Sequence, residues 1–261
     1  MMKAEKTIKF QARRSLSAGN WSLALGCLSV MMIAFLVVFC LYYSLLFGFN
    51  ALNTSTYQIK KSKVLLGLII NTLSVLMVFG ISPITSGFSR LCYNIAVYNR
   101  CSPDDLLFYF TSPKRYFTAL GVISAKLLAF FLACVCFSLP GITFITIGGT
   151  FADGEQTKLA LNIIGGVLSA LGITLAVMYN FRFFLSDFVM AEYGNYGFKA
   201  VISETLKTSK GHTKDIAKLF ISFVFWILLC FFVLPVFYVV PYMGVSFGTS
   251  AKWLIRLKRE A

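Results

Sequence analysis

Long apolar runs without charge are the feature that most constrains the fold of this chain. Five segments of the 261 residues contain no Asp, Glu, Lys or Arg: Ser15–Ile59, Val64–Ser89, Leu127–Ala152, Leu159–Phe181 and Leu219–Ala251. Each exceeds the roughly 20 residues that an α-helix needs to cross the hydrocarbon core of a bilayer. Only 13% of the residues are charged, whereas soluble domains are about a quarter charged. The sequence therefore predicts an all-α, polytopic helical membrane protein, with residues 1–261 forming a single integral membrane domain.

The charge is strongly basic. The net charge is +14, from 24 Lys and Arg against 10 Asp and Glu. The cations flank the apolar runs, as they do where a membrane protein faces the cytoplasm and anionic headgroups. We therefore expect a lipid bilayer with anionic headgroups as the partner, and no nucleic acid. The first apolar run starts near Trp21 and is much longer than the apolar core of a signal peptide, so we expect it to stay as the first span.

The apolar runs predict about six spans. Four are Leu23–Phe47, Val64–Tyr98 with a bend near Pro83, Tyr116–Leu139 ended by Pro140-Gly141, and Leu159–Met190. The final run is either one long span or two short ones, Leu219–Leu234 and Tyr242–Leu257, with Pro235 and Pro241 bracketing a turn.

Charge distribution favours two spans in the final run. They return the C-terminal cations to the side of the other basic segments, so both termini are expected in the cytoplasm. Lys60, Lys61 and Lys63 oppose this arrangement because they would lie outside. All other Lys and Arg residues except Lys158 lie outside the two charged outer loops, so the bias persists.

A polar amphipathic segment precedes each pair of spans. The best patterned is in Tyr196–Lys218, where Phe198, Val201, Ile202, Thr205 and Leu206 recur with helical spacing. Residues 3–20 form a basic counterpart, and Ser102-Pro103-Asp104-Asp105 starts a third helix. Such helices are expected in the cytoplasmic interface, with their apolar side facing the membrane.

These segments suggest an internal threefold repeat. Ala24-Leu25-Gly26-x-x-Ser29 recurs as Ala119-Leu120-Gly121-x-x-Ser124. An amphipathic segment, an ascending span and a descending span then occur three times, at about 3–98, 99–190 and 191–261. The pattern predicts three helical hairpins as pseudo-repeats. Chance similarity among apolar helices is the alternative.

Ionisable residues in or beside the apolar runs are the candidate functional residues. Arg90, Arg182 and Lys252 are cations near the cytoplasmic ends of the descending spans. Arg90 and Arg182 are expected at the headgroup level, where they bind phosphate or backbone carbonyls. Lys126 lies deepest, and Lys126 and Arg182 are the candidate partners of Asp187. Arg182 and Asp187 do not share a helix face, so an interhelical partner is expected in preference to their pairing with each other. Lys126 has a plainer interpretation, in which its side chain extends back to the interface.

The sequence predicts no enzyme. It contains no HExxH, GxSxG or Walker-type motif, so no catalytic or cofactor-binding residues and no cofactor are assigned. Seven cysteines and a single histidine form no metal-binding pattern, so no metal site is assigned either.

Several short motifs occur in an order that resembles a known family. They are Ala12-Arg13-Arg14-Ser15-Leu16, Gly19-Asn20-Trp21, Gly87-Phe88-Ser89-Arg90, Leu139-Pro140-Gly141-Ile142, Ser209-Lys210-Gly211-His212, Trp226-Ile227-Leu228-Leu229 and Pro241-Tyr242. This order resembles a bacterial integral-membrane family catalogued as domain of unknown function 975. That family in turn resembles the membrane domain of some glycerophosphodiester phosphodiesterases. The resemblance implies a bacterial cytoplasmic (plasma) membrane and no known activity, and the longer insert after Pro140-Gly141 departs from it.

Two functions are therefore expected from different classes. The first is a non-enzymatic membrane scaffold, accessory or lipid-interacting protein. Its expected partner is another membrane protein or a second copy of this chain. The alternative is a transporter or an exporter-associated permease subunit, which the intramembrane charges and the repeat favour.

Overall fold

The computed structural model describes residues 2–52, 60–150, 154–232 and 234–260. These residues form helices joined by turns, with no strand among them. The side chains of Lys60, Lys61 and Lys63 lie outside the described part of the chain. In chain order the elements are α1 (Met2–Ser17), α2 (Trp21–Leu52), α3 (Lys60–Ile81), α4 (Pro83–Tyr98), α5 (Asp104–Leu107), η2 (Phe108–Phe110), α6 (Pro113–Thr150), α7 (Glu155–Asn180), α8 (Ser186–Glu192), α9 (Phe198–Ser209), α10 (Thr213–Ile221), α11 (Val224–Leu229), η3 (Cys230–Phe232) and α12 (Val236–Glu260).

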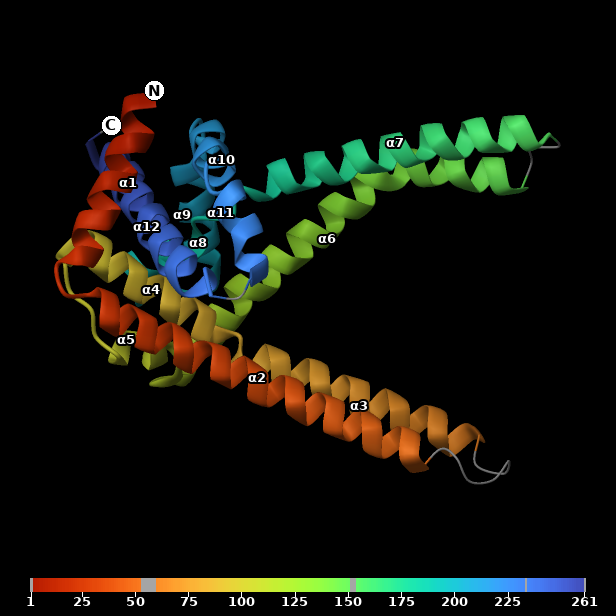
Figure 1. Ribbon diagram of the computed structural model, residues 1–261, viewed down its shortest axis with the longest axis horizontal. Coiled ribbons are helices and arrows are strands. Elements are labelled where there is room, and N and C mark those ends of the chain that lie inside the picture. The colour runs from red at the N-terminus through yellow and green to blue at the C-terminus, as the bar shows by residue number, and fades with distance from the viewer. Residues whose placement is uncertain (1, 53–59, 151–153, 233, 261) are drawn as a thin grey trace.

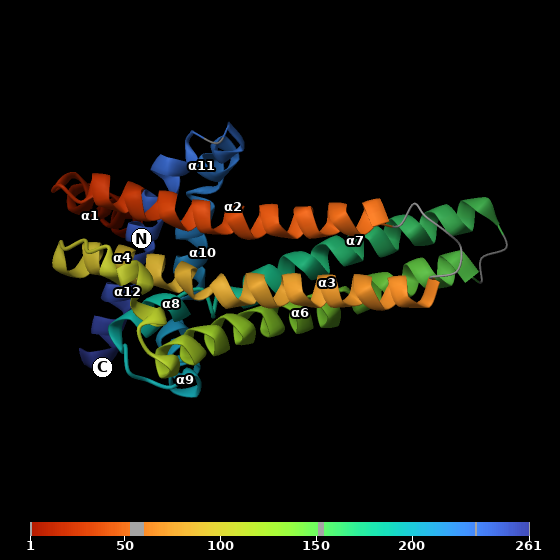
Figure 2. The same ribbon diagram turned by 90° about the horizontal axis from the view of Figure 1, so that it is seen from below.

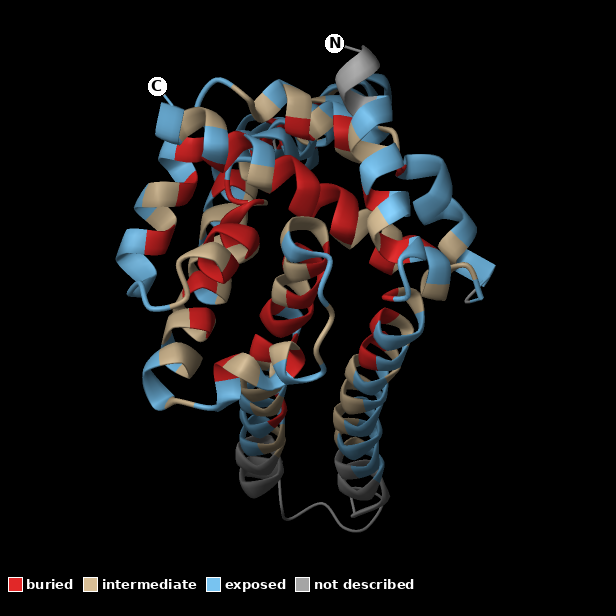
Figure 3. Ribbon diagram, turned by 90° about the vertical axis from the view of Figure 1, so that its left-hand side faces the viewer, coloured by how far each residue is buried: buried red, intermediate tan, exposed pale blue. Residues whose placement is uncertain are grey.

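Two long helical hairpins project from a head of shorter helices (Figures 1 and 2). The hairpins are α2–α3 and α6–α7, and the head contains α1, α4, α5, α8, α9 and α12. Buried residues concentrate in the head, whereas the described residues of the α2–α3 hairpin beyond the head are mostly exposed or intermediate (Figure 3). The two termini lie close together at the head, away from the hairpin tips (Figure 1).

The long helices are apolar enough to cross a membrane. Four candidate spans are Trp21–Ser44, Gly67–Tyr98, Pro113–Thr150 and Glu155–Asn180, and α10 with α11 and η3 forms a further candidate, bent by 41°. Large apolar side chains such as Leu36 and Phe131 are exposed on the hairpins. Such an apolar outer face is favourable in lipid, where the helices satisfy their own backbone hydrogen bonds. The prediction of a multi-pass helical membrane protein is therefore confirmed.

The structure corrects three predicted boundaries. Pro140 does not end a helix, because α6 continues from Pro113 to Thr150 with Pro140 inside it. A helix that stopped there would expose backbone groups to hydrocarbon, whereas a continuous helix loses one hydrogen bond. Similarly, Pro241 lies inside α12, which starts at Val236 directly after the turn.

The third correction concerns the fourth predicted span, which is not continuous to Met190. Helix α7 ends at Asn180, and a turn over residues 181–185 leads into α8. Phe183 and Leu185 of this turn are buried in the head. Their burial outweighs continuation of the helical period, and it changes the direction of the chain before Asp187.

Close backbone contact joins α6 and α7 into a hairpin. A Cβ atom added to Gly172 would lie 2.2 Å from the carbonyl oxygen of Phe137, and one added to Gly165 would lie 2.7 Å from that of Gly141. Glycine is therefore required at both positions for the helices to approach this closely. Small residues at helix contacts are typical of membrane proteins, since van der Waals packing drives association there.

The amphipathic helices pack on the head. Helix α1 packs against α12, α5 against α4, and α9 against α8. Val201 and Thr205 of α9 are fully buried, whereas Phe198 at its start is exposed. Part of the predicted apolar face of α9 is thus used for protein packing. The contact between α1 and α12 brings the two termini to the same end of the molecule.

Candidate functional site

An ion pair joins Lys126 and Asp187 where the α6–α7 hairpin meets the head. The Nζ atom of Lys126 in α6 lies 2.5 Å from Oδ2 of Asp187 in α8. The side chains are 23% and 17% exposed, so water competes little for the pair. Ser86 in α4 donates a hydrogen bond of 3.0 Å to the other carboxylate oxygen, Oδ1. The expected pairing of Asp187 with Lys126 across helices is confirmed.

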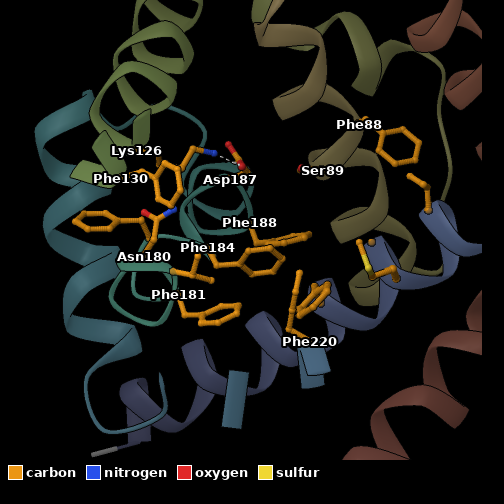
Figure 4. A pocket seen from close by; sticks show the side chains of 16 residues that line it. Phe88, Ser89, Lys126, Phe130, Asn180, Phe181, Phe184, Asp187, Phe188 and Phe220 are labelled. Carbon is orange, nitrogen blue, oxygen red and sulfur yellow. Dashed lines mark hydrogen bonds and ion pairs between the residues drawn. The ribbon is translucent and has the colours of Figure 1, made fainter. Parts of the chain in front are cut away.

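A cavity of about 420 Å³ lies beside this ion pair (Figure 4). It is formed by α4, α6, α7, α8, α10 and α12 together with the turn after α7. Most lining residues are apolar, and phenylalanine dominates. The lining comprises Phe88, Ser89, Lys126, Phe130, Val177, Asn180, Phe181, Phe183, Phe184, Asp187, Phe188, Phe220, Val240, Met243, Gly244 and Phe247. We call this the phenylalanine cavity.

The local sequence around Asp187 builds much of the phenylalanine cavity. Residues Asn180–Phe188 read NFRFFLSDF, and the turn that contains them places several aromatic rings on one side. Phe184 packs edge-on against Phe247 of α12, with ring centroids 4.4 Å apart. Such edge-to-face contacts are favourable for aromatic rings. They fix the turn against the head.

Asn180 lines the phenylalanine cavity, but its Oδ1 atom is buried out of contact with the cavity. No described residue donates a hydrogen bond to this atom. Neither Asn180 nor Ser86 was predicted from the sequence as a site residue. The concentration of phenylalanine around Asp187 was a signal that could have drawn attention to this segment.

Arg90 holds together a polar cluster between α4, α5 and α8. Its Nε donates to Oδ1 of Asp105, and its Nη1 donates to the carbonyl oxygen of Ala191, each at 3.2 Å. The guanidinium carbon lies 3.5 Å from the ring centroid of Phe108, and that of Arg115 lies 4.2 Å from the same centroid. The expected binding of Arg90 to a backbone carbonyl is confirmed, and it falls at the negative end of α8.

Lys252 makes a similar contact elsewhere in the head. Its Nζ atom donates to the carbonyl oxygens of Ala96 and Val97 near the end of α4, at 3.4 and 3.2 Å. A second cavity, of about 820 Å³, opens at this point between α1, α4 and α12. We call it the basic cavity, and its lining comprises Thr7, Ile8, Gln11, Ser15, Ala96, Val97, Tyr98, Asn99, Thr249, Lys252, Trp253 and Arg256.

Arg182 stands apart from the other candidates. It lies in the turn after α7 with its side chain exposed, and its guanidinium carbon is 5.2 Å from the ring centroid of Tyr179. Among the described residues it forms no ion pair with Asp187. The five candidates therefore occupy four places, and only Lys126 and Asp187 are brought together.

Within the described ranges, no group of three His, Cys, Asp or Glu side chains is placed to hold a metal ion. The two cavities instead combine apolar walls with a few charged groups, an arrangement typical of small-molecule and lipid sites.

Comparison of the chain with protein-family models, curated proteins and solved structures gave no match. The geometry of the two cavities is therefore the basis for a functional assignment.

Proposed function

We propose that this protein is a non-enzymatic, lipid-interacting membrane protein that binds an anionic phospholipid in the basic cavity and serves as a scaffold or accessory subunit. The observation that carries the proposal is the basic cavity itself, with Lys252 and Arg256 in its wall. It lies between α1, α4 and α12, at the end of the molecule opposite the hairpin tips (Figure 1). Cations at a membrane surface attract anionic headgroups by about 1 kcal/mol each.

The residues of the basic cavity suit an amphiphile. Arg256 is exposed and can form a bidentate contact with a phosphate. Gln11 and Ser15 of α1 provide further hydrogen-bonding groups on the opposite wall. Ile8 and Trp253 supply apolar surface for the start of an acyl chain, and tryptophan favours the headgroup level of a membrane.

The proposal includes the finer architecture: six membrane segments in three repeated units, both termini in the cytoplasm, and a bacterial plasma membrane as in the family of domain of unknown function 975. Its support is the packing order of the head. Each amphipathic segment packs on the final helix of the preceding unit, α5 on α4 and α9 on α8, and α1 packs on α12. Arg90 and Lys252 likewise each cap the end of another unit's final helix.

Lipid selectivity tests the proposed function. The purified protein is incorporated into nanodiscs of phosphatidylcholine with increasing phosphatidylglycerol, and bound lipid is identified by native mass spectrometry. We expect retained phosphatidylglycerol, and about 3- to 10-fold weaker retention in Arg256→Gln, because one charge-assisted phosphate contact is lost. Arg13→Gln is the matched control, because Arg13 is exposed on α1 outside the lining of the basic cavity. Equal retention of both lipids, or equal losses in the two variants, contradicts the proposal.

A transporter or permease subunit is the second candidate function, and the Lys126–Asp187 pair favours it. The pair connects a helix of a long hairpin with a short helix of the head, so its opening would let the two move relative to each other. Solute flux in proteoliposomes is the test, with the variants Lys126→Ala and Asp187→Ala. Flux that both variants leave unchanged removes the basis for this function.

A further inference from the structure

We propose that a further cavity in the head binds a second phosphate group, in a site built like the basic cavity. This cavity has a volume of about 460 Å³ and lies between α4, η2, the start of α6 and the end of α8. We call it the arginine cavity, and its lining comprises Arg90, Tyr93, Asn94, Tyr98, Phe108, Arg115, Ala191, Glu192, Tyr193, Gly194, Asn195 and Tyr196. The inference rests on the proposed function, because it extends the phosphate chemistry of the basic cavity to a second place.

The arginine cavity and the basic cavity have the same construction. In each, a cation on the final helix of one unit donates to carbonyl oxygens in the last turn of another unit's final helix. Lys252 of α12 donates to the last turn of α4, and Arg90 of α4 donates to Ala191 in the last turn of α8. An amphipathic segment completes the wall, α1 in the basic cavity and η2 in the arginine cavity. The two cavities therefore occupy equivalent positions of the proposed repeat, and Tyr98 lines both.

Arg115 supplies the positive charge that attracts a phosphate to the arginine cavity. The other charged residues of the lining, Arg90 and Glu192, each have an oppositely charged partner. Among the described residues Arg115 forms no ion pair, and its guanidinium donates one hydrogen bond, of 3.1 Å, to Oγ1 of Thr111. Its other N–H groups remain available for a bidentate contact with a phosphate. The charge that the protein leaves uncompensated thus favours an anionic ligand.

A smaller cavity of about 200 Å³ adjoins the arginine cavity and adds polar groups. The two cavities share Arg115, Gly194, Asn195 and Tyr196. Lys114 and Ser112 also line the smaller cavity, and within the described ranges Lys114 forms no ion pair. A ligand at this junction meets two cations, an amide and a hydroxyl. Such a set of donors matches the several oxygens of a phosphate, and it includes the fork of an arginine.

Ion pairs occupy the third position of the proposed repeat. This position lies where α8 and α9 pack against α12. Glu204 of α9 pairs with Lys258, and Glu192 of α8 pairs with Arg259 at 2.7 Å. The two acids neutralise both cations at the end of α12, so no phosphate is expected there. The head is therefore expected to hold two phosphate groups rather than one or three.

The number of retained phosphatidylglycerol molecules tests this inference. The full-length protein in phosphatidylcholine nanodiscs with increasing phosphatidylglycerol is examined by native mass spectrometry, and we expect two retained molecules. Arg115→Gln should weaken one binding event about 3- to 10-fold and Arg256→Gln the other, so only the double variant weakens both. Arg13→Gln is the matched control, because Arg13 is exposed and lies outside the lining of both cavities.

A soluble phosphate ester distinguishes a lipid headgroup from a free phosphate as the ligand. Glycerol 3-phosphate is titrated calorimetrically into the protein in phosphatidylcholine nanodiscs. A second phosphatidylglycerol that Arg115→Gln weakens assigns the arginine cavity to a lipid. Binding of glycerol 3-phosphate that Arg115→Gln weakens, without a second retained lipid, assigns it to a soluble phosphate ester.

The outcomes separate this inference from the proposed function. Loss of retention in Arg256→Gln alone overturns the second site and leaves the proposed function in place. Loss in Arg115→Gln alone has the opposite meaning. A single retained lipid in the unaltered protein, with no binding of glycerol 3-phosphate, overturns the inference however the variants fold. Arg115→Lys keeps the charge but not the bidentate contact, so its loss should be smaller than that of Arg115→Gln.

Discussion

Lys126 and Asp187 lie 61 positions apart in the sequence, yet the Nζ and Oδ2 atoms of their side chains are 2.5 Å apart. Lys126 belongs to α6 of the long α6–α7 hairpin, and Asp187 belongs to α8 in the head. The turn after α7 makes this contact possible, because it changes the direction of the chain just before Asp187. The ion pair thus fixes the base of the hairpin against the head and borders the phenylalanine cavity.

Breaking this ion pair should destabilise the fold. In Lys126→Met or Asp187→Asn, one largely buried group loses its charged partner. We expect the free energy of unfolding of each variant to fall by about 1–3 kcal/mol. This loss lies between those typical of exposed and of fully buried ion pairs. The measurement is the unfolding midpoint of the purified protein in detergent, followed by a thermal-shift dye or by scanning fluorimetry.

The double variant separates the ion pair from other effects of the two substitutions. Lys126→Met combined with Asp187→Asn leaves no unpaired charge, so its loss of stability should be clearly smaller than the sum of the single losses. Strictly additive losses would show that the two side chains do not interact in the folded protein.

The glycines between α6 and α7 should not tolerate alanine. In Gly172→Ala the new Cβ would lie 2.2 Å from the carbonyl oxygen of Phe137, so the helices must separate. We expect a loss of about 1–3 kcal/mol, typical of overpacking. Gly166→Ala is the matched control on the same helix, since nothing lies within 4 Å of its added Cβ. It should be neutral or slightly stabilising, because alanine favours helix formation. Equal unfolding midpoints for the two variants would contradict the close approach.

Local sequence signals predicted the class of fold and several of its boundaries. Charge-free runs identified the long helices, and Pro83 marked the start of α4, because local composition and backbone chemistry determine both. The helix end predicted at Pro140 and the turn predicted at Pro241 were wrong, because a helix in a membrane accommodates a proline in its interior. Packing of α6 against α7 at Pro140, and of α12 within the head at Pro241, decides those positions rather than local preference.

The candidate site was predictable only in part. Lys126 and Asp187 were identifiable because a charge beside or within an apolar run is rare. An interhelical partner for Asp187 was expected because Arg182, five residues away, does not share its helix face. The phenylalanine cavity was not identifiable, because it depends on rings contributed by distant segments such as Phe220 and Phe247. Such a cavity exists only in the tertiary structure and has no local sequence pattern.

Cys101 in the loop after α4 should react slowly with alkylating reagents. Burial, reinforced by the nearby Cys27 and Asp105, raises the pKa of the Cys101 thiol to about 11. The thiolate is the reactive form. At pH 8 it would therefore make up about 0.1% of Cys101, against about a quarter for a thiol with an ordinary pKa near 8.5.

The pH dependence of alkylation measures this shift. The rate at Cys101, followed by peptide mass spectrometry with iodoacetamide, should rise about tenfold per pH unit up to about pH 10. In the chain denatured with dodecyl sulfate and urea, the rate should instead level off near pH 9. The same early plateau in the folded protein would show that Cys101 is not shielded.

Membrane orientation is tested by placing cysteines at opposite ends of the molecule. Thr157 lies near the tip of the α6–α7 hairpin and Glu260 ends α12, and both are exposed. We expect a membrane-impermeant maleimide to label Thr157→Cys on intact cells, but to label Glu260→Cys only after the membrane is permeabilised. The reason is that all Lys and Arg residues except Lys60, Lys61, Lys63 and Lys158 lie outside the two charged outer loops, in agreement with the positive-inside rule. The unaltered protein, with its seven native cysteines, provides the background. Labelling of Glu260→Cys on intact cells would place the C-terminus outside and rule out the six-segment arrangement with both termini in the cytoplasm.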